Sequence, residues 1–280
     1  MEFLNLKQNG KNKFIGTNLW SPFKGYATFG GQLAAQSLCA GLLTISSDSL
    51  PSILHTLFIN PGDPNKPIEY EVEILKNGNS IQMRNIIGRQ DGILIVQTCI
   101  SCSKKEITLK EILYDVKIYK DNFISLMKYI DLHFEENNEL RKKQIEFIKE
   151  NLGVLNNSFY IEVGEFRDNT RQIKITFLND LKDNNQFSMF VTLLSDLLVV
   201  ESALLSLNLK LFSKELHKIS SIDHNLYFVS CELPKDKTIY YILECSSVKE
   251  SKANIMGKIC TSDGKLICTT SQQALVRLKK

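Results

Sequence analysis

The segment that decides the fold reads Arg89-Gln90-Asp91-Gly92-Ile93-Leu94-Ile95-Val96-Gln97-Thr98, and a related segment near the end of the chain reads Thr261-Ser262-Asp263-Gly264-Lys265-Leu266-Ile267-Cys268-Thr269-Thr270. In both copies the Asp-Gly pair, the Leu-Ile pair and a Thr occupy the same positions. An Asp-Gly pair next to an apolar run is typical of a tight hairpin between two strands. The repeat therefore predicts two related halves, each containing an antiparallel hairpin.

The elements around the two hairpins come in the same order. Residues 54–58 (Leu-His-Thr-Leu-Phe) parallel residues 223–227 (Asp-His-Asn-Leu-Tyr), and each segment leads through a Pro-containing loop into a strand that carries a Tyr. Apolar helices are expected before these strands, at residues 31–45 and 196–209. Each half thus reads as a strand, a long helix and several antiparallel strands. This is an α+β pattern in which the sheet can wrap its own helix.

A charged segment separates the halves. Residues 136–151 are rich in Glu, Lys, Arg and Gln, with a few apolar positions, which is typical of a helix exposed on most of its surface. We therefore expect an N-terminal domain at residues 1–115, a linker with a helix at 116–154 and a C-terminal domain at 155–280. The first strand of the second domain is expected at 159–163.

Composition excludes several classes of protein. The chain has 280 residues, 43% of them hydrophobic, so it can bury a sizeable core. Its net charge of +3 comes from 34 basic and 31 acidic residues spread along the chain, which argues against a nucleic-acid partner.

Residues 191–209 are strongly apolar, but Asp196 and Glu201 interrupt them, so a buried helix is expected instead of a membrane span. With no basic region followed by an apolar run at the N-terminus, we expect an intracellular protein.

The seven cysteines form neither a disulfide framework nor a zinc spacing with the four histidines. Cys99 and Cys102 make a CxxC pair, but they lie in or just after an apolar strand, where residues three apart point to opposite faces. We expect most of the cysteines to be small buried hydrophobes, and no metal site.

A polar residue interrupts the inner face of the last strand. Even-numbered positions from 266 to 276 form the more apolar face of that strand, so they are expected to point inward. Gln272 belongs to this face, where an amide costs free energy unless it is hydrogen-bonded. Its counterpart in the first copy is Ile100. This asymmetry predicts a buried polar site in the second half only.

Asp196 is the second candidate residue. It begins an otherwise apolar predicted helix, where a carboxylate is favoured as a cap of free backbone amides. If Asp196 instead points into a pocket beside Gln272, the carboxylate and the amide could together hold a water molecule. Both interpretations stay open at the level of the sequence.

Several motifs together resemble the acyl-CoA thioesterase II family, from Phe3-Leu4-Asn5-Leu6 to the final strand. They are Phe29-Gly30-Gly31-Gln32, His55, Pro61-Gly62-Asp63, Pro67-Ile68, Gly78-Asn79-Ser80, Arg84 and Ser221-Ile222-Asp223-His224. The resemblance implies a double hotdog fold, with two antiparallel sheets each wrapped around a central helix and joined edge to edge. It further implies hydrolysis of fatty acyl-CoA to free fatty acid and coenzyme A, and a homodimer or higher homo-oligomer.

The resemblance also implies a catalytic set. The Asp of the family's Ser-Asp motif matches Asp196, the Gln of its last strand matches Gln272, and its Thr before Ile-Asp-His matches Ser221. Ser221 departs from the usual Thr but keeps the hydroxyl. Around an attacking water these residues need no metal, no covalent intermediate and no cofactor other than the coenzyme A of the substrate.

Substrate contacts are expected elsewhere in the chain. Gly30 and Gly31 open the first helix, where their amides could stabilise an oxyanion or where two glycines could simply allow tight packing. Arg84, Lys252 and Lys258 are candidate contacts for the phosphates of coenzyme A.

Two alternatives on the same fold are a non-catalytic acyl-CoA-binding protein and an enoyl-CoA hydratase. The hydratase would need an Asp and a His together, whereas Asp223 and His224 are adjacent on a strand and point to opposite faces. His55 and His224 lie at equivalent strand starts in both halves, which favours structural hydrogen bonds for each.

The chain ends in Leu278-Lys279-Lys280 and not in a Ser-Lys-Leu type signal, so we expect a cytoplasmic protein, with the peroxisome as the alternative.

Overall fold

The computed structural model describes residues 4–23, 25–106, 110–112, 115–133, 139–211 and 213–279. In the first half the elements are β1 (Lys7–Gln8), β2 (Lys13–Gly16), α1 (Gly30–Leu42), β3 (Ser49–Phe58), β4 (Ile68–Asn77), β5 (Ile81–Gln90) and β6 (Ile93–Lys104). The linking segment contains β7 (Ile124–Ser125), α2 (Leu126–His133) and α3 (Glu139–Asn156). The second half contains β8 (Phe159–Val163), β9 (Thr170–Phe177), α4 (Asn184–Leu194), α5 (Val199–Ser206), β10 (Leu216–Ser221), β11 (Asp223–Phe228), β12 (Thr238–Lys249), β13 (Lys252–Thr261) and β14 (Leu266–Leu278).

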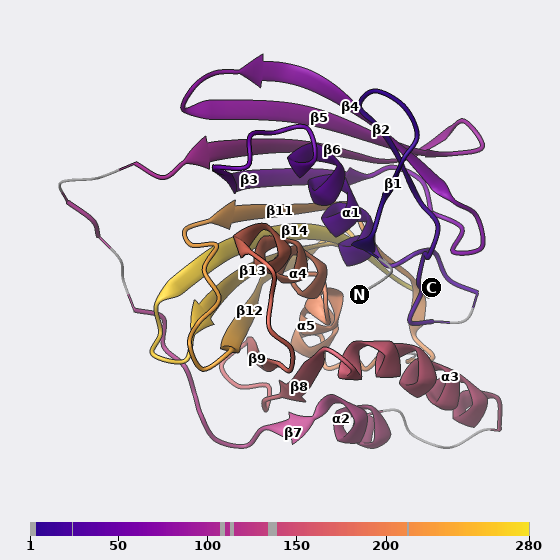
Figure 1. Cartoon of the computed structure of the whole chain (residues 1–280). Helices are drawn as coiled ribbons and strands as arrows, with labels where there is room; N and C mark the ends of the chain where they lie inside the picture. Colours follow the sequence, from indigo (N-terminus) through magenta and orange to yellow (C-terminus); the bar gives the residue numbers. More distant parts are fainter. Residues whose placement is uncertain are drawn as a thin grey trace.

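All of these strands belong to one continuous antiparallel sheet (Figure 1). Its order is β1-β2-β4-β5-β6-β3-β11-β14-β13-β12-β9-β8-β7, with β10 pairing β14 beside the main path. The halves meet where β3 pairs with β11, with Leu57 opposite Asp223 and Leu54 opposite Leu226. Edge-to-edge joining of the halves is therefore confirmed, and it covers two strand edges that would otherwise be exposed.

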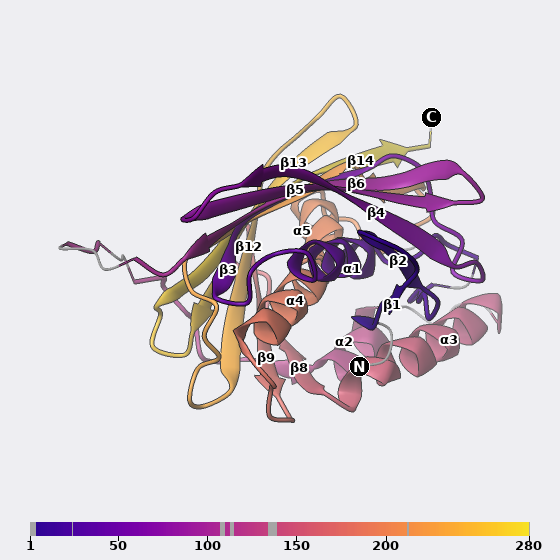
Figure 2. The ribbon, with the colours of Figure 1, turned by 45° about the horizontal axis from the view of Figure 1, so that its top comes forward.

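The sheet curves over the helices α1, α4 and α5, which lie on its concave side (Figure 2). Residues on nearly every side of α1 are buried, including Leu33, Ala34 and Leu38, as expected for a helix that is apolar all round. Gly41 allows the close approach to the sheet, because a Cβ atom there would lie 2.3 Å from Ile100 Cδ1. The predicted α+β double hotdog is confirmed by this arrangement.

The second central helix differs from the prediction. Residues 196–209 were expected to form one helix that begins at Asp196. Instead α4 ends at Leu194, a turn follows in which Leu198 has a left-handed backbone (φ 58°), and α5 then begins at Val199. Asp196 therefore lies in the turn between two short helices and not at the start of one.

One stretch in the described residues, Asn184–Ser206, is long and apolar enough to cross a membrane, with a mean hydropathy of 1.8. It comprises α4 and α5, and 78% of its most apolar window is buried inside the protein. This burial matches the expected core helix.

The linking segment packs against the second half through a buried polar group. The hydroxyl of Tyr129 on α2 donates to Glu201 Oε1 on α5 at 2.6 Å, and Arg171 Nη2 on β9 donates to the same hydroxyl at 2.7 Å. Burial raises the pKa of Glu201, and the guanidinium of Arg171 and the bond from Tyr129 oppose that rise. The predicted linker helix, at 136–151, corresponds to α3 from residue 139 on, and residues 136–138 lie outside the described residues. Helix α2 was not predicted.

The cysteines are mostly buried, as expected. Cys102, Cys231, Cys245, Cys260 and Cys268 are buried and all seven cysteines are free thiols. Cys99 is exposed whereas Cys102 is buried, so the CxxC pair does point to opposite faces of β6.

Candidate active site

Three side chains of the second half meet near the junction of the halves. Gln272 on β14 donates from Nε2 to Asp196 Oδ1 at 3.1 Å and to Ser221 Oγ at 2.6 Å. The first half contributes the amide of Gly31, which donates to Asp196 Oδ2 at 2.8 Å. Asp196, Ser221 and Gln272, singled out from the sequence, are therefore brought into one hydrogen-bonded cluster.

The local path of the chain explains how Ser221 reaches this cluster. β10 and β11 both pair with β14, and the chain bends between them at Ile222. The amide of Ile222 donates to the Gln273 carbonyl at 2.8 Å, and the Ile222 carbonyl accepts from the Phe58 amide on β3 at 3.0 Å. Ser221 ends β10 opposite Ala274, so its hydroxyl lies beside Gln272, two residues away on the same face of β14.

The carboxyl group of Asp196 titrates near neutrality. Burial raises its pKa from 3.8 to about 7, although the bonds from Gln272 and from the Gly31 amide favour the charged form. The N-terminus of α1, which supplies the Gly31 amide, also favours a negative charge. Asp196 can therefore gain or lose a proton close to neutral pH, as a general base must.

Glycine is required where α1 approaches this turn. A Cβ atom on Gly31 would lie 2.3 Å from the Leu193 carbonyl oxygen, and one on Gly30 would lie 2.8 Å from Asp196 Oδ2. Tight packing is thus one reason for both glycines. The amide of Gly31 is used by Asp196, so Gly30 is the remaining oxyanion candidate of the pair.

The candidate phosphate contacts lie apart from the cluster. Arg84 is 1% exposed, and its guanidinium donates to Thr44 Oγ1 and to the carbonyls of Thr44, Lys76 and Met83. This cation holds the core of the first half together, so we remove Arg84 from the candidate contacts. Lys252 and Lys258 are exposed on β13 at positions that alternate with buried ones, so they occupy the sheet face opposite to the buried one that carries Gln272.

The two histidines are not equivalent, contrary to the prediction. Leu54 is opposite Ile100 in the first half, and the register of β11 with β14, in which Asn225 is opposite Ser271, places His224 opposite Gln272. Because Ile100 and Gln272 are counterparts, the counterpart of His224 is Leu54. His224 is fully buried, whereas His55 is exposed and lies 3.1 Å from the Tyr227 hydroxyl.

Sequence reasoning therefore missed His224 as a neighbour of the site. Its repeat alignment was displaced by one residue in the β3 segment, because it matched the two histidines instead of the strand registers. Asp223 points away from His224, and its carboxylate accepts from the Gln273 amide at 2.6 Å, so the two do not cooperate as a hydratase pair.

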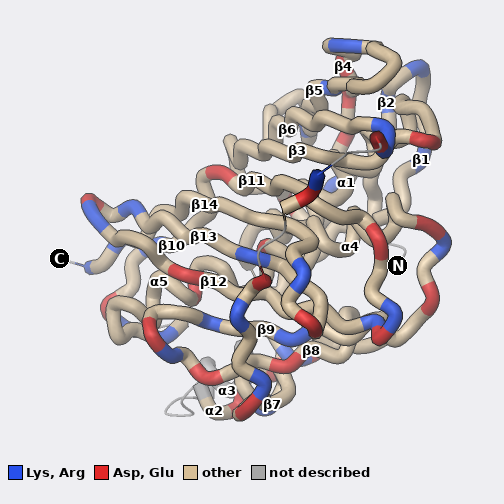
Figure 3. Tube along the Cα trace, turned by 90° about the vertical axis from the view of Figure 1, so that its left-hand side faces the viewer, with Lys and Arg blue, Asp and Glu red and all other residues tan. Residues whose placement is uncertain are grey.

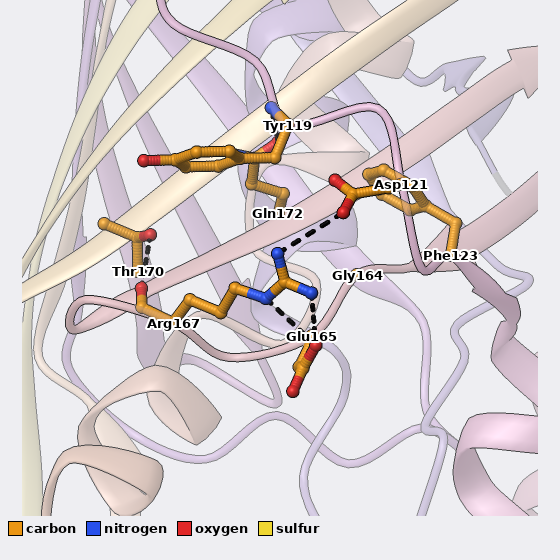
Figure 4. A pocket seen from close by; sticks show the side chains of 8 residues that line it. All are labelled: Tyr119, Asp121, Phe123, Gly164, Glu165, Arg167, Thr170 and Gln172. Atoms are coloured by element: carbon orange, nitrogen blue, oxygen red, sulfur yellow. Dashed lines mark hydrogen bonds and ion pairs between the residues drawn. The ribbon is translucent and has the colours of Figure 1, made fainter.

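A pocket elsewhere in the structure contains none of the candidate site residues named above. It lies between the linking segment and the turn from β8 to β9 (Figure 4). Its cation, Arg167, donates to Glu165 at 2.6 Å and 2.9 Å and also contacts Asp121. The guanidinium is already neutralised, so this pocket is a poor anion site. Elsewhere basic and acidic residues are interspersed over the chain (Figure 3).

Known proteins resemble the chain along its whole length. The acyl-CoA thioesterase N-terminal domain model matches residues 18–103, and the acyl-CoA thioesterase model matches residues 149–275. Acyl-coenzyme A thioesterase 8 of Homo sapiens is 23% identical over 99% of the chain and 88% of its own length. Acyl-CoA thioesterase 2 of Haemophilus influenzae is 25% identical over 90% of the chain and 88% of its own length.

A solved structure shows the same fold. An acyl-CoA thioesterase II from Mycobacterium marinum superimposes with a TM-score of 0.78 over 100% of this chain and 97% of that one, at 20% identity. The fold and the matched domain models define a thioester hydrolase with two hotdog domains. The chain belongs to the acyl-CoA thioesterase II family.

Proposed function

We propose that this protein hydrolyses fatty acyl-CoA with a water molecule held by Asp196, Ser221 and Gln272. The observation that carries the proposal is the double hydrogen bond of one amide group, because Gln272 Nε2 donates both to Asp196 Oδ1 and to Ser221 Oγ. These bonds bring a carboxylate, a hydroxyl and an amide within reach of one water molecule.

Asp196 is the general base in this proposal. It takes a proton from the water, and the resulting hydroxide attacks the thioester carbonyl carbon. The tetrahedral intermediate then collapses with cleavage of the carbon–sulfur bond, and the proton passes from Asp196 to the departing thiolate of coenzyme A. A pKa of about 7 suits both steps, because Asp196 must accept a proton and then release it.

The oxyanion needs hydrogen-bond donors as charge develops on the carbonyl oxygen. We assign this role to the first turn of α1, where the Gly30 amide points out of the helix N-terminus and the Gly31 amide already holds Asp196. The first half thus supplies backbone groups, and the second half supplies the three side chains.

The test is hydrolysis of acyl-CoA followed with a thiol-detecting reagent over several chain lengths. Asp196→Asn should lower single-turnover hydrolysis by roughly two to four orders of magnitude, because an amide does not take a proton from water at neutral pH. Asp183→Asn is a matched control, since Asp183 is a true helix cap that accepts from the Gln186 amide at 2.7 Å on α4. Hydrolysis by Asp196→Asn within a few-fold of the Asp183→Asn control would show that the mechanism is wrong.

We further propose a reaction without metal or cofactor, a cytoplasmic protein with the peroxisome as the alternative, and a homodimer or larger homo-oligomer. The last proposal is supported by apolar side chains exposed on the outer face of the central strands, such as Leu57, Tyr227 and Met256. Activity after dialysis against a chelator, the position of a tagged protein in cells and light scattering in solution test these three points in turn.

A further inference from the structure

Two buried atoms without a hydrogen-bond partner in the described ranges belong to His224 and Gln272. They are His224 Nδ1 and Gln272 Oε1. A buried polar atom left unpaired is costly, so native proteins rarely keep one without a reason. Two such atoms on adjacent side chains, one able to donate and one able to accept, can satisfy each other.

The strand register makes the two side chains neighbours. His224 on β11 is opposite Gln272 on β14, and both are buried, at 0% and 3% exposed, so they share the inner face. Side chains opposite each other in an antiparallel pair have Cβ atoms about 5 Å apart. Burial lowers the pKa of His224 to about 4, and the nearby Gln272 side chain opposes that shift.

The second ring nitrogen of His224 has its own partner. His224 Nε2 lies 2.7 Å from the hydroxyl oxygen of Ser195, which is fully buried and directly precedes Asp196. A neutral imidazole has one donor and one acceptor nitrogen. The Ser195 hydroxyl also lies 2.8 Å from the Thr192 carbonyl, which can only accept, so its one proton goes either to Thr192 or to Nε2. If Nδ1 carries the ring proton, the hydroxyl turns to donate to Nε2 and Nδ1 donates to Gln272 Oε1, so no nitrogen of the ring is left unpaired.

We propose that His224 is a positioning residue that fixes the amide of Gln272 through an Nδ1–H···Oε1 hydrogen bond. With Oε1 held by His224, the NH₂ group of Gln272 faces Asp196 and Ser221, as the hydrolytic site requires. The opposite orientation would turn the amide oxygen toward the Asp196 carboxylate, where two acceptors would face each other. This role rests on the proposed function, since it acts through Gln272.

The first half of the molecule provides a matched apolar control. Leu54 and Ile100 occupy the positions that His224 and Gln272 occupy in the second half, and both are buried. His224→Leu and Gln272→Ile therefore introduce a pair that this fold already accommodates. The double variant reproduces the first-half pair in the second half.

The experiment measures kcat, KM and melting temperature for the parent, the two single variants and the double variant. His224→Leu should lower kcat roughly 10- to 100-fold with little change in KM, because it releases a positioned amide without removing a substrate contact. In the Gln272→Ile background, His224→Leu should cause no further loss of kcat. His224→Asn should recover kcat to within about 5-fold of the parent, because its amide can donate from near the place of Nδ1.

Independent effects of the two substitutions on kcat, or a His224→Leu variant within about 2-fold of the parent, would overturn the positioning role. The proposed function fails separately, if Gln272→Ile or Asp196→Asn keeps the activity of the parent. A loss of activity in those two variants combined with an independent effect of His224 would leave the function standing and reject only the positioning role.

A second measurement uses the parent protein and so does not depend on how the variants fold. In protein labelled with ¹⁵N-histidine, the ring shifts report which nitrogen carries the proton, and the signal that disappears in His224→Asn identifies His224. We expect a neutral Nδ1–H ring throughout about pH 5 to about pH 8. A neutral Nε2–H ring, or a charged ring in this range, contradicts the proposal.

Discussion

Gln272 shows how a single residue can distinguish two halves of similar fold. It stands where the first half has Ile100, and its amide joins Asp196 and Ser221 instead of filling the core. The sequence predicted this residue because a polar side chain on an apolar face contradicts the local pattern. It could not predict Ser221 without the family resemblance, because the bend at Ile222 that brings Ser221 to Gln272 leaves no signal in strand alternation.

The first prediction at this scale is that Gln272→Ile folds but loses hydrolysis. An isoleucine already packs at the equivalent position, so the melting temperature should stay close to that of the parent. Hydrolysis should fall by at least about 100-fold, because the water and Asp196 lose their positioning group. Circular dichroism and the thiol assay on one preparation measure both quantities, and normal turnover by a folded variant would show that Gln272 is only a core amide.

The pKa of Asp196 leads to a second prediction, about pH. A general base works only when ionised, so kcat/KM should rise as pH rises and level off above about pH 7. Asp196→Asn should show no such rise. A parent profile that is flat from about pH 5 to about pH 8 contradicts the assignment.

The same titration has the opposite effect on stability. The folded-state pKa of Asp196 is raised to about 7 from 3.8, so between these values the folded protein holds a proton that the unfolded chain has lost. This contribution to stability is lost as pH rises through about 7. The depressed pKa of His224 makes stability change with pH in the opposite direction. The contribution of Asp196 is therefore isolated as the melting temperature of Asp196→Asn minus that of the parent. This difference should increase from about pH 5 to about pH 8, and a constant difference would contradict the raised pKa.

At the scale of elements, apolar and alternating runs predicted some helices and strands closely. Residues 31–45 matched α1, and 159–163 matched β8, because long apolar or alternating runs define such elements well. The break between α4 and α5 was missed, because a left-handed backbone is usually adopted by Gly or Asn, and here the residue is Leu198. That break carries Asp196 to the N-terminus of α1, so its cap-like contact is with a helix from the other half.

Helix α2 buries the apolar Leu126 and Ile130, and Tyr129 between them adds buried polar contacts. Tyr129 joins α2 to Glu201 on α5 and to Arg171 on β9. Tyr129→Phe should therefore lower the free energy of unfolding by about 1–3 kcal/mol, because it removes two buried hydrogen bonds, the one that Glu201 Oε1 accepts and the one that Arg171 Nη2 donates. Hydrolysis measured well below the melting temperature should not change. Tyr160→Phe is the control, since Tyr160 is 50% exposed on β8, and equal melting temperatures for the two variants would contradict the structural role of Tyr129.

At the scale of the whole molecule, one sheet runs through both halves. The pairing of β3 with β11 was predictable from the fold that the family resemblance implies, but its register was not, because a shift of one residue exchanges the faces of a strand. Aligning the two histidines displaced the comparison of the halves by one residue in this strand, so His55 and His224 were wrongly treated as counterparts. The register also places His224 on the inner face beside Gln272 and leaves His55 outside.

The continuous sheet leads to the last prediction, which is that both halves unfold together. Leu54 of the first half and Leu226 of the second are opposite each other in the joining strands, and both are fully buried. Trp20 is the only tryptophan in the chain; it lies in the first half, and its indole donates to the Asn151 carbonyl on α3. Its fluorescence reports the first half together with that contact, whereas reaction of the buried Cys268 thiol, located by mass spectrometry, reports the second half. Denaturant curves from the two signals should have one midpoint.

Leu54→Ala should shift both curves equally, by a loss of about 2–5 kcal/mol. Ile112→Ala, at an exposed position outside the sheet, should shift neither. A fluorescence transition separated from the exposure of Cys268 would mean that the halves are independent folding units and that the β3–β11 pairing does not couple them.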